Sequence, residues 1–81
     1  MRTHTQKDIA FRVRDDFPER LKSVVRGSGE TVINFSGSIG HDRKALYSWM
    51  DGRQVPNADA LYTICRLYKV SADWLLGLDG A

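Results

Sequence analysis

Polar and basic side chains gather between residues 42 and 54, and their types suit the recognition of nucleic acid. On a 3.6-residue period, one side of a helix would carry Arg43, Lys44, Tyr47, Ser48 and Asp51. An arginine can bond the O6 and N7 atoms of guanine in a bidentate manner, a lysine can reach the same acceptors or a phosphate, and a serine hydroxyl can pair with either type of base. This segment is therefore a candidate surface for reading double-stranded DNA.

An apolar stripe beside these residues can anchor the same segment, and it consists of Leu46, Trp49 and Met50. Asp42 is a residue type that caps helix starts, while Gly40 before it and Gly52 after it suit turns. We therefore expect a short helix from about Asp42 to Asp51, held by its apolar side and exposed on its polar side.

The size and composition of the chain fit one small domain. Its 81 residues include 42% hydrophobic ones, enough for a core, although a chain of this size buries only about 60 to 65% of its unfolded surface. No apolar run approaches the ~20 residues of a membrane span, and the N-terminus lacks the apolar core of a secretory signal. The lone Cys65 lies in an apolar pattern and is expected to be a plain buried thiol, so a cytoplasmic location is the economical interpretation.

The pattern from residue 17 onward predicts an all-α bundle of about five helices, one domain covering residues 17–81. The first helix is expected to begin near Asp16, with Asp16 as its cap and Pro18 in its first turn, and to end at residues 27–29. The second follows Thr31 and ends at the glycine turn, the fourth follows Asn57, and a short fifth follows Ser71. Outside the third helix, the expected inner sides carry Phe17, Leu21, Val24, Val25, Val32, Phe35, Ser36, Ile39, Leu61, Ile64, Cys65, Tyr68, Trp74 and Leu75.

Residues 1–16 form a basic arm whose structure the pattern leaves open. Residues 1–14 hold four basic side chains against one acidic side chain, although the whole chain has a net charge of only +2. Ile9, Val13 and Phe17 have helical spacing, whereas residues 11–14 alternate like a strand. Arg12 and Arg14 at its end could follow the minor groove of DNA or belong to a mobile positive tail.

Two short helices joined through a glycine turn, within a small bundle, are typical of a helix-turn-helix. From Phe17 to Gly77 the chain resembles the phage-repressor-like (Xre/Cro/CI-type) helix-turn-helix transcription regulators, which share the lambda-repressor-like fold. The resemblance is carried by residues 19–22, 29–31, 39–40, 46–49, 52–56 and 68–77. The last two runs are the most telling, because they match the family's loop after the reading helix and its closing helix.

The resemblance implies a homodimeric DNA-binding domain whose third helix enters the major groove of an operator. It places Arg43, Lys44 and Ser48 where relatives touch base edges, with Tyr47 and Asp42 near enough to touch backbone or base. The function it implies is transcriptional regulation, most simply repression. The physical properties of these side chains agree with the assignment, because a good bidentate contact contributes about 1 to 3 kcal/mol of discrimination between bases.

Contacts to the DNA backbone are expected from two flanking segments. The start of the second helix, at Thr31 and Val32, presents free amides and a positive dipole end, and Arg53 and Gln54 in the loop can clamp the sugar-phosphate chain. The chain departs from the family at Val32, where relatives often have a glutamine that helps hold the phosphate. Asn34 and Gly37 are further departures.

Alternatives remain open at several positions. Arg43 and Lys44 could be an ordinary solvated helix face, Tyr47 could pack on a neighbouring helix, and His41 is expected at the surface of the turn. A helix-turn-helix can also serve as a protein-interaction module such as an antirepressor, with a regulatory protein as its partner. The small net charge and Val32 favour this alternative.

Enzymatic chemistry has little support in the sequence. A zinc site would need His4, His41 and Cys65 to meet from an arm, a turn and the core, without the paired local spacing of structural sites. The chain has no glycine loop of the kind that binds phosphate and no recognisable nucleophile motif. We therefore expect no catalytic residues, no metal and no cofactor.

Overall fold

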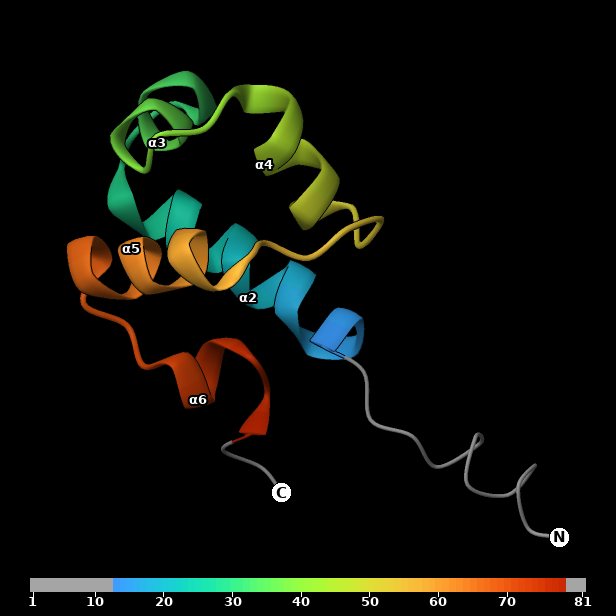
Figure 1. The fold of residues 1–81 in the computed structure, drawn as a ribbon. Coiled ribbons are helices and arrows are strands. Elements are labelled where there is room, and N and C mark those ends of the chain that lie inside the picture. The colour runs from blue at the N-terminus through green and yellow to red at the C-terminus, as the bar shows by residue number, and fades with distance from the viewer. Residues whose placement is uncertain (1–12, 79–81) are drawn as a thin grey trace, which may run out of the picture.

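The computed structural model describes residues 13–78, which form five α-helices and, within that range, no β-strand (Figure 1). The helices are α2 (Val13–Ser28), α3 (Val32–Ser38), α4 (Arg43–Met50), α5 (Ala58–Tyr68) and α6 (Ala72–Leu75). The predicted all-α class and the number of helices are confirmed for this part of the chain. Residues 1–12 of the predicted basic arm, including Arg12, lie outside the described residues.

The first helix begins one turn earlier than the sequence suggested. Helix α2 starts at Val13, so Asp16 lies inside it and is not its cap, and Pro18 is an interior residue. Val13 and Phe17 are four residues apart, so the helical spacing of apolar residues extends upstream of the apparent cap. Because proline has no backbone N–H, α2 lacks one internal hydrogen bond at Pro18.

The core gathers around α2. This helix packs against α4 and α6, while α3 packs against α4 and α5 against α6 (Figure 1). The six largest fully buried side chains come from all five helices and are Phe17, Leu21, Phe35, Leu46, Ile64 and Leu75. Each was expected to face inward, because each falls on the apolar side of its helix.

Some side chains that helical spacing placed on the inner sides are less buried than expected. Leu61, Cys65, Tyr68 and Trp74 are only partly buried against the core cluster. Ala60, which the sequence did not single out, is 2% exposed. Ala60 lies four residues before Ile64 on the same side of α5, so its burial agrees with helical spacing.

Two predicted caps, Asp42 and Asn57, are confirmed, and Thr31 and Ser71 cap the helices that were expected to follow them. Each cap side chain accepts a hydrogen bond from the backbone amide three residues later, which satisfies an amide that the helix leaves free. The donor–acceptor distances are 3.1 Å for Thr31, 2.9 Å for Asp42, 2.8 Å for Asn57 and 3.3 Å for Ser71. The caps therefore fix where α3 and α4 begin, and with them the approach to the candidate surface.

Gly37 gives a stability prediction within α3. Glycine in a helix interior is less favourable than alanine by about 0.5 to 1 kcal/mol, and a Cβ atom added at Gly37 would meet no atom within 4 Å. Gly37→Ala should therefore raise the free energy of unfolding by about that amount in urea denaturation. Gly40→Ala is the matched control, because Gly40 has a φ of 78° and an alanine there should be destabilising. A loss of stability in the Gly37 variant would contradict the open surroundings of this position.

Candidate nucleic-acid interface

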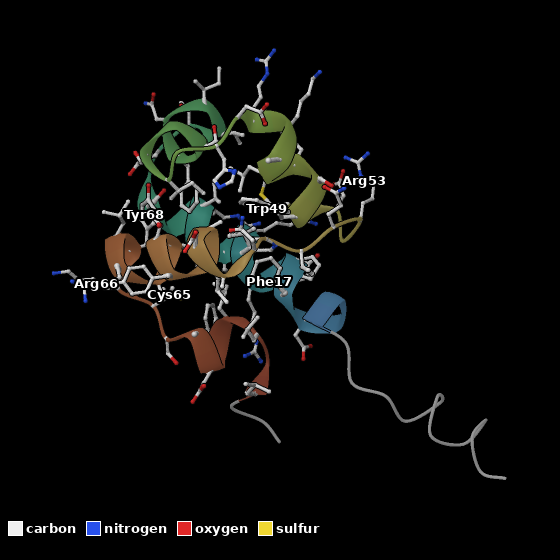
Figure 2. The ribbon with its side chains drawn as sticks, in the orientation of Figure 1. Phe17, Trp49, Arg53, Cys65, Arg66 and Tyr68 are labelled. Atoms are coloured by element: carbon white, nitrogen blue, oxygen red, sulfur yellow. The ribbon has the colours of Figure 1, made fainter. Side chains whose placement is uncertain are left out.

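Helix α4 has one buried side and one exposed side, as its sequence predicted. Leu46, Trp49 and Met50 are 0%, 4% and 8% exposed, and Figure 2 shows Trp49 directed into the interior. Arg43, Lys44 and Tyr47 lie on the exposed side. Tyr47 is 46% exposed, so a large part of its side chain is accessible to a partner.

Five of the predicted contact residues surround one open depression of about 540 Å³, and they are Lys44, Tyr47, Ser48, Arg53 and Gln54. The first three come from α4 and the last two from the loop after it. Figure 2 shows Arg53 extending away from the core near the start of this loop. The structure therefore brings together predicted base-reading and backbone-contacting residues that the sequence assigned separately.

Hydrogen bonds fold the loop back onto α4. The backbone amide of Arg53 donates to the carbonyl of Ser48 at 3.0 Å, and the amide of Gln54 donates to the same carbonyl at 3.4 Å. The Ser48 hydroxyl also donates to Oε1 of Gln54 at 3.3 Å. Gly52, with a φ of 78°, supplies the left-handed conformation that this reversal needs. Ser48 and Gln54 consequently act as a pair that the sequence did not indicate.

The positive charges of this surface differ in how far they are neutralised. Arg53 forms an exposed ion pair with Asp51 at 3.1 Å, a kind of contact that contributes little and exchanges readily with water. Among the described residues, no carboxylate lies within ion-pair distance of Arg43 or Lys44. These two side chains are therefore available to acceptors outside the molecule.

Asp42 has a structural role at this surface. Its carboxylate accepts from the amide of Ala45, as the cap of α4, and remains exposed beside Arg43. A carboxylate repels phosphate, whereas it can accept from the amino group of cytosine. Of the two contacts that the resemblance allowed for Asp42, the base contact fits its chemistry better.

At the start of α3, the backbone is better suited to contacting DNA than the side chains are. The Thr31 hydroxyl accepts from the amide of Asn34, and the Val32 side chain packs against the core cluster. The apolar Val32 side chain therefore cannot replace the polar contact that a glutamine would make. Any contribution of Val32 to a phosphate contact would come from its main-chain N–H.

A second depression, of about 350 Å³, lies between α3 and the start of α4. Its lining consists of Ile33, Ser36, Gly37, His41, Asp42 and Arg43. His41 is half-buried, with its ring edge-on to Trp49 at 5.1 Å between centroids, so it is less exposed than expected for a turn residue. Ile33 is 59% exposed here. It falls outside the inner side predicted for α3, which holds Val32, Phe35, Ser36 and Ile39.

Tyr68 connects α5 to α3 and to the segment before it. Its ring stacks on Phe35 with 4.2 Å between centroids, and its hydroxyl donates to the Glu30 carboxylate at 3.2 Å (Figure 2). Burial raises the pKa of Tyr68, and the neighbouring Glu30 raises it further, so the hydroxyl remains a donor at neutral pH. This contact positions the segment that leads into Thr31.

Cys65 lies on the neighbouring turn of α5 and is partly buried. Burial raises the pKa of its thiol, which disfavours the nucleophilic thiolate. This environment fits the expected plain thiol. Among residues 13–78, no three His, Cys, Asp or Glu side chains gather closely enough to hold a metal ion.

The chain shows no match to any protein-family model, to any curated protein or to any solved structure. No helix among the described residues combines the length and the apolar composition needed to cross a bilayer.

Proposed function

We propose that this chain binds double-stranded DNA in a sequence-specific manner as a transcriptional regulator, most simply a repressor that reads an operator through the major groove. The observation that carries the proposal is the exposed side of α4, where Tyr47 and Ser48 line a depression shared with the following loop. Within residues 13–78, no carboxylate forms an ion pair with Arg43 or Lys44 on this side. In this proposal α4 reads base edges and the loop grips the backbone.

The arrangement of α3 and α4 supports this proposal. The two helices pack against each other across a tight turn at Gly40, and α4 is anchored on α2 by its apolar side. A helix held in this way can project its other side into a major groove, which is about 12 Å wide. The resemblance to phage-repressor-like helix-turn-helix regulators supports the same assignment of helices, with α3 lying across the backbone and α4 in the groove.

We further propose that the chain acts as a two-fold dimer. A single α4 offers few base contacts, and two copies would read two half-sites about one helical turn apart. Regulators of the family that the chain resembles bind in this way.

Salt dependence of binding to random duplex DNA tests the proposal directly. On random DNA, Arg43, Lys44 and Arg53 would each neutralise one phosphate, which gives a slope of about −0.9 per contact in a plot of log affinity against log salt. Three contacts per protomer should lower the affinity about fortyfold between about 50 and 200 mM salt. Fluorescence anisotropy with a labelled duplex measures this slope. No detectable binding at low salt would contradict the proposal.

A protein-interaction module, such as an antirepressor that binds another regulator, is the second candidate. The observation that favours it is the exposed side of α5, where Tyr62 is 62% and Leu67 is 51% exposed. Aromatic and aliphatic side chains of this kind can anchor a protein partner. This candidate predicts weak or absent binding to DNA at low salt together with binding that depends on Tyr62 and Leu67.

A further inference from the structure

Ile33 presents an aliphatic side chain to solvent in the first turn of α3. At 59% exposure it is the most exposed large aliphatic residue among the described residues. The helix does not need it for anchoring, because Val32 packs on the core cluster and Phe35 is fully buried. A β-branched residue does not favour helix formation either. Core packing and helix propensity therefore leave the presence of Ile33 at this position unexplained.

The position of Ile33 places it beside the strongest candidate base reader. Ile33 and Arg43 line the same depression of about 350 Å³, one from α3 and the other from the start of α4. Gly37 lies on its floor, and a Cβ atom added there would meet no atom within 4 Å, so the hollow is open at this point. One hollow thus has an apolar side at Ile33 and a charged side, where Arg43 lies next to the Asp42 carboxylate.

We propose that Ile33 contacts the C5 methyl group of a pyrimidine, either thymine or 5-methylcytosine, close to the guanine read by Arg43. The inference rests on the proposed DNA binding and adds a specificity-determining residue outside α4. In the major groove a C5 methyl is the apolar group of a base edge, and guanine presents the acceptors that suit arginine. Because both side chains border one hollow, the two bases should lie within about two base pairs, at 3.4 Å of rise each.

Removal or addition of single methyl groups in the DNA tests the contact. The probe is a duplex selected from random sequences by the protein, with uracil replacing each thymine in turn, or 5-methylcytosine replacing each cytosine. Loss of a buried methyl should weaken binding about fourfold at one position, and a gained methyl should strengthen it by a similar factor. A loss with uracil identifies thymine as the source of the methyl, and a gain with methylcytosine identifies the other source.

The variant Ile33→Ala should lose this sensitivity and bind the methylated and unmethylated duplexes equally. Its affinity for random duplex DNA should fall by less than its affinity for the selected duplex, because no charge is removed. Leu67→Ala is the matched control, since Leu67 is similarly exposed but lies on α5, and it should retain the sensitivity of the unmodified chain.

Two results would overturn the inference while leaving the proposed DNA binding intact. One is that no single methyl group changes the affinity of the unmodified chain, and the other is that Ile33→Ala keeps the full methyl effect. In both cases, binding that still depends on Arg43 would show that the proposed function holds. A failure to bind any duplex at low salt would overturn both.

Discussion

Arg43→Ala should lower the affinity for a selected DNA site about 5- to 150-fold for each protomer bound, which corresponds to the about 1 to 3 kcal/mol of a bidentate contact to guanine. The effect should be large because Arg43 is exposed and, among the described residues, faces no carboxylate that already satisfies its guanidinium group. On random duplex DNA the same variant should lose only the affinity that one phosphate contact contributes. Binding titrations of the selected and random duplexes at one salt concentration measure the difference.

Arg66→Ala provides the matched control for this prediction. It removes the same charge from an exposed position on α5, and Figure 2 shows Arg66 and Arg53 extending from opposite sides of the molecule. The control variant should bind the selected site almost as tightly as the unmodified chain. If Arg43→Ala and Lys44→Ala both leave affinity and site preference unchanged, α4 is not the reading helix.

Selection of bound sequences from random duplexes would also show which base positions each variant affects. A palindromic consensus with half-sites about one helical turn apart would support both major-groove reading and a two-fold dimer. Repeating the selection with Arg43→Ala should relax the preference at the guanine position alone, because the other contacts remain. A consensus without symmetry would argue against the proposed dimer.

Local signals in the sequence were sufficient to predict most of the fold. Asp42 and Asn57 were recognisable as caps. The spacing of Leu46, Trp49 and Met50 identified the buried side of α4, because caps and helical periodicity act over a few residues. The start of α2 was predicted wrongly at Asp16. There, the cap residue type of Asp16 indicated a helix start, whereas the spacing of Val13 and Phe17 indicated that the helix begins earlier.

The candidate site was predictable as a set of residues but not as an arrangement. The hydrogen bond between Ser48 and Gln54 depends on how the loop reverses after α4, and the shared depression of Ile33 and Arg43 depends on how α3 meets α4. Both are relations between elements, which periodicity along one helix does not encode. The predicted inner side of α3 already excluded Ile33, but only the packing of α3 on α4 shows that Ile33 lies beside Arg43.

Leu46→Ala should lower the free energy of unfolding by about 2 to 5 kcal/mol, because the side chain is fully buried where α4 meets the core. A domain of this length has a total stability of only about 4 to 12 kcal/mol. At about 4 to 8 °C per kcal/mol, the melting temperature should therefore fall by about 8 °C or more. Thermal unfolding followed by circular dichroism measures this loss.

The adjacent variant Tyr47→Ala should have the opposite pattern of effects. Tyr47 is 46% exposed on the other side of the same helix, so its removal should change stability by no more than about 0.5 kcal/mol while weakening binding to the selected DNA site. Leu46→Ala, once corrected for its folded fraction, should bind that site as the unmodified chain does. These neighbouring residues therefore separate the anchoring side of α4 from its reading side. A large loss of stability in Tyr47→Ala, with no loss in Leu46→Ala, would mean that α4 presents the other side to the core.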